Sequence, residues 1–237
     1  MFTPSEEQRA GIRRAHAERS ACWDYRHVIC PAKESVLYDL MPEGFGYENY
    51  GPCLARQLGE GFYHPDAIRH GFSCLDTHWT DRGAFDYLSL AIKEFPPGPA
   101  LPETVRSIGR RVGDLGVKIG RAAEDVPLVQ CVQPTVVVVE ESTIINEGYH
   151  RIQRSAATGR ALILHDSNVH NLFHILGEMY GETIFVHSPD LDLSAAEEIQ
   201  PDVVWFFQAE RFLPRVPRND VTWAWRNTQT DQALQRA

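Results

Sequence analysis

The stretch RALILHDSNVHNLFHILGEMY (residues 160–180) decides how this chain folds. Its apolar run at 161–164 is typical of a strand that is buried on both faces of a sheet. The run leads into residues 169–180, where apolar side chains recur with the 3.6-residue period of a helix that buries one face. A buried strand that continues directly into an amphipathic helix is the repeating unit of a parallel α/β fold.

The same alternation extends through the second half of the chain. Further apolar runs at 136–139, 184–186 and 203–207 predict three more strands buried on both faces. Ser194, followed by Glu197, predicts a short capped helix before the last of them. Because strands that alternate with helices pair in parallel, the sequence predicts a three-layer α/β/α domain with a mostly parallel sheet.

The first half of the chain predicts fewer elements. Ser5 with Gln8 three residues later is a capping-box signature, which predicts a polar helix over residues 5–23. The other elements expected here are a short strand at 28–30, a loop at 42–52, a short helix at 54–58 and a helix at 82–95.

The length of 237 residues is about 1.6 times the typical domain size, which fits one large α/β domain with additions. We therefore expect a single domain over residues 1–237, with its core at about 24–213 and the N-terminal helix at 1–23. The PPGP segment at 96–99 predicts that residues 96–130 form an excursion rich in proline and glycine. Residues 214–237 are mostly polar, and we expect a tail on the surface.

The charge balance excludes several classes of partner. The chain carries 23 Lys and Arg against 32 Asp and Glu, a net charge of −9. Binding along a nucleic-acid backbone requires a surplus of basic side chains, so neither nucleic acid nor an anionic membrane surface is expected as a partner. No window reaches about 18 apolar residues, so we expect no insertion into a membrane.

The cysteines and the N-terminus bear on the compartment. The five cysteines are an odd set without CxxC spacing, which argues against a zinc ribbon or a complete disulfide framework and favours reduced, mostly buried thiols. The first twenty residues contain no apolar stretch long enough for a signal peptide. We therefore expect a cytoplasmic protein, whereas a leader absent from this sequence would place it in the periplasm.

Two local patterns suggest nucleophilic catalysis. Ser167 lies between the carboxyl end of a buried strand and a helix, which is where open α/β sheets bind their ligands. Asp76 and His78 are two residues apart, so in an extended backbone both side chains project to the same side and the carboxylate can orient the imidazole. Each pattern alone has a structural alternative: Asp166 or Ser167 as a helix N-cap, and an Asx turn before a helix that begins at 80 or 81.

Several motifs, in order along the chain, resemble the alginate O-acetyltransferases and their relatives, which carry an SGNH-hydrolase-like domain. The most distinctive is DTHWT at 76–80, followed by Gly83-Ala84. The others are CPAKESVLY at 30–38, GDL at 113–115, HDS at 165–167, and PDVVW at 201–205 with ERFL at 210–213. Together these motifs span residues 30–213, most of the chain.

This resemblance implies an SGNH-hydrolase-like domain in which the Asp-His pair precedes the serine, and a mechanism with a covalent intermediate. Ser167 would attack an acyl donor, His78 would take its proton as general base, and Asp76 would orient His78. The acetyl group would then pass to a carbohydrate hydroxyl. The expected partners are therefore a carbohydrate acceptor and an acyl donor, which is a co-substrate of unknown identity; no cofactor and no protein partner are indicated. The candidates for oxyanion or substrate binding are Asp166, Asn168, His165, Trp79 and Arg211.

Two other functions fit the same residues. Transfer of the acyl group to water would make the protein a carbohydrate esterase. A catalytically silent carbohydrate-binding protein on the same fold is also possible, because His165 stands where relatives usually carry a small residue or an arginine. Tyr47, Tyr50, Phe62, Tyr63 and Trp79 are candidates for stacking on a sugar ring, with packing as the simpler alternative.

The histidines of the 169–180 segment give a weaker signal. His170 and His174 are four residues apart, with His165 just before them, which is a spacing that metal sites use. They fall away from the apolar stripe of the helix, however, and a metal site would need a third ligand there and a second shell of supporting residues. We therefore expect a solvated helix face and no metal. Glu210 and Arg211 could form a structural ion pair or anchor the loops around the site, and we expect the structural role.

Overall fold

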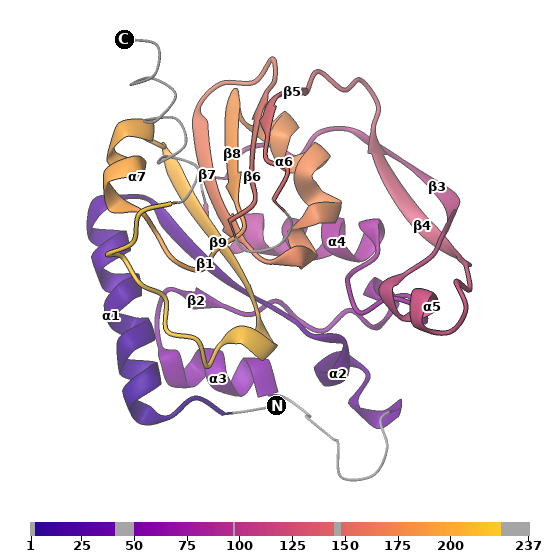
Figure 1. The fold of residues 1–237 in the computed structure, drawn as a ribbon, viewed down its shortest axis with the longest axis horizontal. Helices are drawn as coiled ribbons and strands as arrows, with labels where there is room; N and C mark the ends of the chain where they lie inside the picture. The colour runs from indigo at the N-terminus through magenta and orange to yellow at the C-terminus, as the bar shows by residue number, and fades with distance from the viewer. Residues whose placement is uncertain (1–2, 41–49, 97, 145–147, 224–237) are drawn as a thin grey trace.

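The computed structural model describes residues 3–40, 50–96, 98–144 and 148–223. Its main feature is a seven-stranded sheet in the order β2-β1-β9-β7-β8-β6-β5 (Figure 1). The parallel strands are β2 (Phe62–Tyr63), β1 (Tyr25–Cys30), β9 (Val203–Ala209), β7 (Arg160–His165) and β8 (Glu182–Val186). The antiparallel strands β6 (His150–Arg154) and β5 (Val137–Glu141) complete one edge. The mostly parallel α/β fold expected from the sequence is confirmed.

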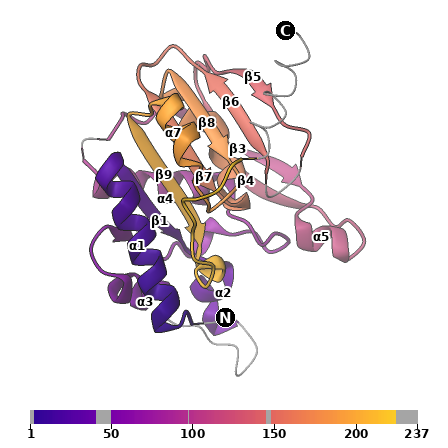
Figure 2. The same ribbon diagram turned by 60° about the vertical axis from the view of Figure 1, so that its left-hand side comes forward.

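Helices cover both faces of this sheet. One apolar cluster joins the sheet to α4 (Asp81–Glu94) and α6 (Phe173–Met179). On the opposite face, α1 (Glu6–Cys22), α3 (Tyr50–Leu58) and α7 (Leu193–Ile199) pack through two further clusters. Figure 2 shows α1 and α7 together on this second side.

The central strand β7 shows why the sequence selects this architecture. Ala161 and Ile163 face the cluster with α4 and α6, whereas Leu162 and Leu164 face the cluster with α7. All four side chains are fully buried. Alternate residues of a strand point to opposite faces, so a run without polar residues requires a layer on each side.

The remaining helices are short, and two of the helices predicted from the sequence begin differently from the prediction. The segment expected as one helix over 169–180 begins as the 3₁₀ helix η3 (Ser167–Leu172) and continues as α6. The helix expected at Ser194 is α7, but its N-cap is Asp192, whose side chain accepts from Ala195 N. The other short helices are α2 (Lys33–Val36), η1 (Tyr38–Leu40), η2 (Arg69–Gly71) and η4 (Glu210–Phe212). In the segment expected as a loop at 42–52, residues 41–49 lie outside the described residues, and α3 begins at Tyr50.

The valine run at 136–139 is the main error in the sequence-based prediction. It was expected to be buried on both faces, but β5 is an antiparallel edge strand, and Val137 is 63% exposed. An apolar run indicates a strand without showing whether the strand lies at the centre or at the edge of a sheet. Its partner β6 was not predicted, because its sequence HRIQR contains a single apolar residue.

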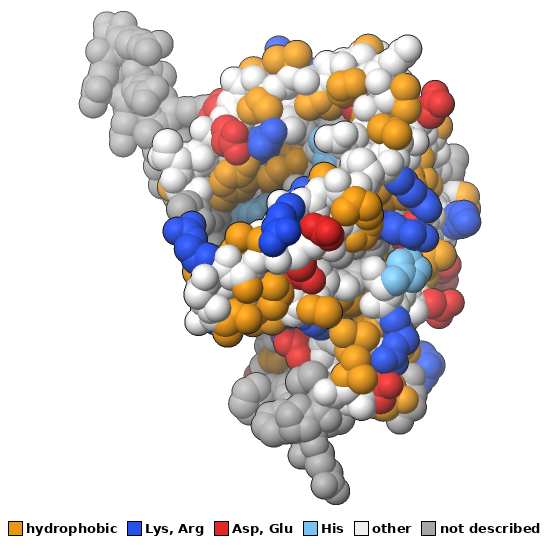
Figure 3. Space-filling view, turned by 90° about the vertical axis from the view of Figure 1, so that its right-hand side faces the viewer, with side chains coloured by type: hydrophobic (Ala, Val, Ile, Leu, Met, Phe, Trp, Pro, Cys, Tyr) orange, Lys and Arg blue, Asp and Glu red, His pale blue; other side chains and the backbone are white. Residues whose placement is uncertain are grey.

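Residues 96–130 form a separate structure beside the sheet. Strand β3 (Thr104–Arg111) pairs antiparallel with β4 (Glu124–Cys131), and α5 (Asp114–Lys118) lies between them. Figure 3 views the molecule from this side and shows hydrophobic side chains exposed among charged ones. The exposed apolar side chains of this region are Val105, Ile108, Val112, Val117 and Ile119. As shown below, β4 and the residues around α5 position one of the site loops.

Two further expectations concern the burial of the cysteines and the absence of a membrane-spanning segment. All five cysteines are free thiols, but the expectation that most are buried is wrong, because Cys22, Cys53 and Cys74 are exposed. These three lie on helix surfaces and in a loop, where the sequence carries no burial signal. Within the described ranges, no helix is both long and apolar enough to cross a membrane.

The segment that follows residue 213 packs more tightly than its polar composition suggests. Trp223 is buried, and its indole donates to the carbonyl of Asp190. Arg19 of α1 is also fully buried, and its guanidinium reaches the side chain of Asn219 at 2.8 Å and the carbonyl of Arg218 at 3.1 Å. The buried guanidinium of Arg19 thus holds this segment against α1, while Arg215, Arg218, Asp220 and Thr222 are exposed, as expected for a segment on the surface.

Replacing Arg19 by methionine should destabilise the fold. The Arg19 guanidinium also donates to the Tyr25 hydroxyl and to the carbonyl of Pro189, so the change leaves buried acceptors without donors. We expect the free energy of unfolding to fall by about 2–4 kcal/mol, measured by urea denaturation. Arg14→Met is the matched control, because Arg14 is exposed on the same helix and its loss should stay within about 0.5 kcal/mol. Equal stabilities of the two variants would contradict this role of Arg19.

Candidate active site

Ser167 lies at the carboxyl edge of the sheet, where it begins η3 two residues after the end of β7. The preceding residue, Asp166, fixes this turn. Its buried carboxylate accepts from Asn168 N at 2.9 Å and also from Ala209 N at the end of β9, so it joins two neighbouring strands. Burial raises the pKa of Asp166, and the two backbone hydrogen bonds act in the opposite direction. Asp166 is thus a structural residue of the turn that presents the Ser167 side chain.

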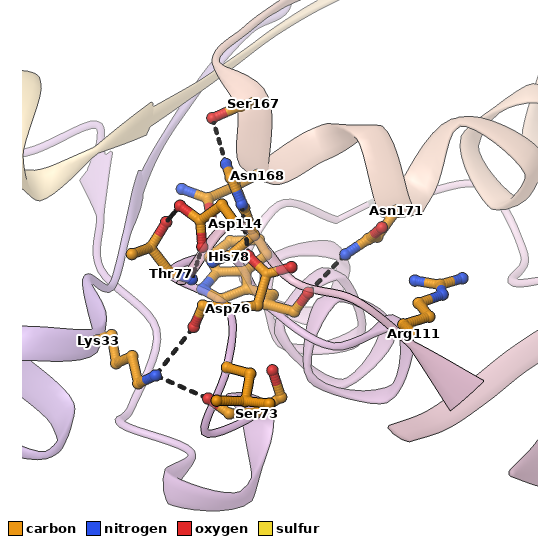
Figure 4. Close-up of polar contacts among 12 residues, drawn as sticks. Lys33, Ser73, Asp76, Thr77, His78, Arg111, Asp114, Ser167, Asn168 and Asn171 are labelled. Carbon is orange, nitrogen blue, oxygen red and sulfur yellow. Dashed lines mark hydrogen bonds and ion pairs between the residues drawn. The ribbon is translucent and has the colours of Figure 1, made fainter. Parts of the chain in front are cut away.

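His78 connects Ser167 with Asp76 (Figure 4). His78 Nε2 lies 2.8 Å from Ser167 Oγ, well within the separation of about 4 Å that a serine–histidine pair in an unliganded site requires. His78 Nδ1 lies 2.7 Å from Asp76 Oδ1, and the same carboxylate oxygen accepts from His78 N at 2.9 Å. The structure therefore brings together the three residues singled out as catalytic, although 89 positions separate His78 from Ser167.

Lys33 holds the loop that carries Asp76. Its ammonium group donates to the carbonyl oxygens of Ser73 at 2.7 Å, Cys74 at 3.1 Å and Asp76 at 2.9 Å. Figure 4 shows Lys33 reaching from α2 towards this loop. An ammonium has three donors, and here each of them has a backbone acceptor on one short segment. Lys33 therefore positions the Asp76 backbone without contacting the serine or the histidine.

The opposite side of the loop is held by the 96–130 segment. Asp114 accepts from Thr77 N at 2.8 Å and from Thr77 Oγ1 at 2.6 Å, between the two functional side chains. Glu124 of β4 accepts from Cys74 N and Leu75 N. A Cβ atom at Gly113 would lie 2.1 Å from the carbonyl oxygen of Leu75, so only glycine permits this close approach. The GDL motif thus has a physical role: it docks the Asp-His loop.

Removing the Lys33 clamp should lower activity more than stability. In Lys33→Met the three carbonyls lose their shared donor, and a displacement of Asp76 by about 1 Å can cost about a hundredfold in rate. We expect kcat/KM for an acetyl ester to fall about 10- to 100-fold. Lys118→Met, at the end of α5, is the control and should leave the rate unchanged. A Lys33→Met variant as active as the unaltered protein would show that the loop holds its geometry without the clamp.

The charges around His78 set its basicity. The hydrogen bond to Asp76 raises the pKa of His78, burial opposes this effect, and the negative charges of Asp76 and Asp114 add to the rise. The histidine therefore holds a proton more strongly than a solvent-exposed imidazole does. Such a base becomes available at a higher pH than an unperturbed histidine does, and it forms a stable imidazolium once it has accepted a proton.

Two cavities flank Ser167. The first, of about 160 Å³, has polar walls that include Asp76, His78, Arg111 and Asn171. The second, of about 270 Å³, is largely apolar; its lining residues include Phe206, Phe207, Phe212 and Pro189. Both have Ser167 in their walls, so a small acyl group and a polar acceptor could approach the serine from different sides.

Of the other site candidates, two have structural partners. The indole of Trp79 is buried, donates to the carbonyl of Pro31 and packs on Tyr87 with ring centroids 4.7 Å apart. Asn168 is buried, and its backbone N–H is taken by Asp166. Arg211 places its guanidinium over the ring of Phe212 at 5.1 Å. A binding role for any of them stays a prediction.

Glu210 has a different partner from the one expected. Its fully buried carboxylate lies 2.6 Å from His64 Nε2 and accepts from Ala32 N at 3.1 Å, instead of pairing with Arg211. The contact with His64 joins the end of β9 to the segment after β2, and the contact with Ala32 joins it to the start of α2, which carries Lys33. Neither partner has a sequence signal, because this buried carboxylate and its donors lie far apart along the chain.

The aromatic residues proposed for sugar stacking do not gather at the cavities. Phe62 packs on His16 and His27, and Tyr63 packs on Phe95. Tyr47 lies outside the described residues. Of the remaining pair, Trp79 lines the polar cavity, whereas Tyr50 lines neither cavity.

The histidines near Ser167 are arranged differently from the expected helix face. His174 Nε2 contacts the carbonyl of Val129 at 2.8 Å, apart from the others. His165 is buried, and burial lowers its pKa well below the ordinary value. Around it lie His170 and His187, with ring centroids 5.6 Å and 5.2 Å from that of His165. The sequence analysis missed His187, although its position directly after β8, at the same sheet edge as His165, was an available signal.

Comparison with known proteins finds similar structures but no similar sequence family. No family model matches the chain, and no curated protein matches it by sequence. The structure of PatB1 from Bacillus cereus with a sulfonyl adduct is 14% identical and superposes with a TM-score of 0.68, over 90% of this chain and 91% of that one. A DHHW family protein from Eubacterium siraeum is 12% identical, with a TM-score of 0.66 over 90% and 88% of the two chains.

A third similar structure is that of an enzyme domain. The O-acetyltransferase domain of Pseudomonas putida AlgJ is 18% identical and superposes with a TM-score of 0.52, over 93% of this chain and 89% of that domain. These three structures share the architecture of this chain over nearly its whole described length. They confirm the fold that the motif resemblance implied.

Proposed function

We propose that this protein is a carbohydrate O-acetyltransferase that forms an acyl-enzyme on Ser167. The observation that carries the proposal is the continuous contact from Ser167 Oγ to His78 Nε2 at 2.8 Å and from His78 Nδ1 to Asp76 Oδ1 at 2.7 Å. A nucleophile, a base and an orienting carboxylate in this order are the components of acyl transfer by serine enzymes.

The first half of the reaction forms the acyl-enzyme. Ser167 Oγ attacks the acetyl carbonyl carbon of the donor while its proton moves to His78 Nε2. Asp76 holds Nδ1–H and stabilises the imidazolium that results. The bond between the acetyl carbon and the leaving group then breaks, and the leaving group takes the proton from His78. Acetyl-Ser167 and a neutral His78 remain.

The second half reverses these roles. The hydroxyl of the acceptor gives its proton to His78 Nε2 and attacks the acetyl carbonyl. The ester bond to Ser167 breaks, and Ser167 Oγ recovers its proton from His78. The acceptor leaves as an acetyl ester. The same three residues thus serve both steps, and the nature of the acceptor decides whether the enzyme acts as a transferase or as an esterase.

Three observations favour an acetyl group and a sugar. The chain resembles the alginate O-acetyltransferases in motif order, and it shares its fold with the O-acetyltransferase domain of AlgJ. The net charge of −9 favours a neutral or weakly charged acceptor over a polyanion.

A covalent probe tests the nucleophile. We expect an aryl sulfonyl fluoride to modify Ser167 stoichiometrically, as seen by intact mass and by mapping of the modified peptide. Preincubation with an acetyl ester should slow the labelling, because acetyl-Ser167 cannot react. Ser167→Ala should remain unlabelled. Modification elsewhere, or no modification of a folded protein, would overturn the assignment of the nucleophile.

Acceptor competition tests the reaction class. The enzyme is incubated with p-nitrophenyl acetate and a panel of neutral oligosaccharides, and the products are analysed by mass spectrometry. Acetylated oligosaccharide that forms at the expense of free acetate supports the transferase. Free acetate as the sole product, at every oligosaccharide concentration, would identify an esterase instead.

A further inference from the structure

Three histidines converge at the carboxyl edge of the sheet, from three different segments. His165 ends β7, His170 lies in η3, and His187 directly follows β8. One ring nitrogen of each lies within 4.8 Å of the corresponding nitrogens of the other two. Parallel strands place their carboxyl ends side by side, so residues 165 and 187 meet here through the strand order and not by local sequence.

We propose that His165, His170 and His187 form a zinc-binding site with an open coordination position. This site is separate from the proposed triad and does not depend on the acetyltransferase assignment. The argument rests on the hydrogen bonding of His165, the chemistry of the ligand set, and the surroundings of the cluster.

The buried ring of His165 is oriented for metal binding. Its Nδ1 lies 2.7 Å from the carbonyl oxygen of Asp166, which can only accept, so Nδ1 carries the ring hydrogen. Nε2 therefore presents a lone pair. That atom is buried and has no hydrogen-bond partner among the described residues. A buried polar atom without a partner destabilises the fold, and a bound cation would satisfy it.

This arrangement is typical of metal-binding histidines. They usually donate the second ring N–H to a carbonyl or a carboxylate, which fixes the tautomer and the ring orientation. In His165 the backbone carbonyl of Asp166 provides that acceptor, and Asp166 is itself held by the ends of two strands. The orientation of the ring is therefore set by the fold before any ion binds.

The ligand set selects the class of metal. All three donors are imidazole nitrogens, which suit zinc, whereas magnesium and calcium require oxygen ligands. Zinc–nitrogen bonds of about 2.0–2.1 Å in a tetrahedron place the nitrogens about 3.3 Å apart. The nitrogens are already within 4.8 Å of one another, and His170 is exposed, so rotation of its side chain can close the site.

The surroundings also fit a bound cation. Phe173 and Phe185 pack against His165, with ring centroids 5.3 Å and 6.2 Å away, and shield one side of the cluster from water. Two nearby cations have acidic partners, which offset their repulsion of a metal ion. Arg151 lies over the Phe173 ring and is paired with Glu141 at 3.2 Å, and Arg215 lines a cavity with His165 and His187 and is paired with Asp190 at 3.1 Å. On the other side, His170 lines the polar cavity that also contains Ser167, so a fourth ligand can enter from there.

Direct binding measurements test the site. Metal-free protein is titrated with Zn²⁺ by calorimetry, and with Co²⁺ while the visible spectrum is recorded. We expect one Zn²⁺ per chain and the intense absorption of tetrahedral Co²⁺. Because loss of an outer-shell partner alone costs about 10- to 100-fold in affinity, removing a ligand in His170→Gln or His187→Gln should weaken binding at least a hundredfold. Zn²⁺ should also raise the melting temperature of the unaltered protein, and it should raise those of His170→Gln and His187→Gln much less.

Two controls make the result decisive. His174→Gln changes a histidine of the same helical segment that contacts Val129 instead, and it should bind Zn²⁺ normally. Asp76, His78 and Asp114 form a second group that could hold an ion, so His78→Asn is tested as well and should also bind normally. Binding that survives in His170→Gln/His187→Gln, or that is lost in His78→Asn, would overturn the proposal. So would the absence of any Zn²⁺ binding by the unaltered protein.

Discussion

Ser167→Ala is expected to lower the turnover of an acetyl ester by about three to six orders of magnitude. The change removes the hydroxyl oxygen that His78 activates for attack on the acetyl donor. Ser167 Oγ contacts His78 Nε2 at 2.8 Å, and this contact alone should disappear in the variant. Because the hydroxyl sits in the wall of a cavity, the free energy of unfolding should change by no more than about 1 kcal/mol.

The measurement is kcat/KM with p-nitrophenyl acetate, together with the initial burst of nitrophenol that reports the acyl-enzyme. Both should vanish in Ser167→Ala while the denaturation midpoint stays in place. Ser107→Ala is the matched control, since Ser107 is exposed on β3, and it should retain full activity. A folded Ser167→Ala variant that still shows a burst would mean that another residue carries the acetyl group.

The serine and the Asp-His pair could be predicted because each depends on a local pattern. The strand β7 is apolar on both faces, so its end and the helix after it were defined by neighbouring residues. Asp76 and His78 lie two residues apart, and their mutual contact needs only an extended loop. The order of these segments along the chain then supplied the resemblance that joins them.

What the sequence could not predict is how the two halves of the site reach each other. The Asp-His loop is docked by Lys33, Asp114 and Glu124, which lie about 40 residues away on either side. A lysine that donates to three carbonyls, or a glutamate that accepts from two backbone amides, looks in the sequence like any surface charge. Such contacts depend on tertiary structure, for which a single sequence carries no periodic signal.

The errors share the same cause. Val137 is apolar but exposed, Cys53 is exposed although the thiols were expected to be mostly buried, and Trp223 belongs to a mostly polar segment but is buried. In each case composition was taken as a guide to burial, and the position of the segment in the fold overrode it. The cluster around His165 follows the same rule, because His187 joins it through strand order and not through spacing along the chain.

Asp76→Asn should produce the second large effect, with a lower rate and a shifted pH profile. The asparagine amide cannot stabilise the imidazolium, and it favours the wrong tautomer of His78, so the maximal rate should fall by about 10³- to 10⁴-fold. The hydrogen bond to Asp76 is the main cause of the raised pKa of His78. Without it the pKa of His78 falls, although the charge of Asp114 still supports part of the rise.

The sign of the shift follows from the role of the base. Only neutral His78 can take the proton of Ser167, so the rate of the unaltered enzyme should rise with pH through the raised pKa of His78. In Asp76→Asn the midpoint of this rise should move to lower pH. The profile is recorded as kcat/KM against pH. Asp125→Asn, which changes an exposed side chain of β4, is the control and should leave the profile unchanged. If the midpoint stayed in place in Asp76→Asn, or if the rate of the unaltered enzyme fell as pH rose over this range, His78 would not be the general base oriented by Asp76.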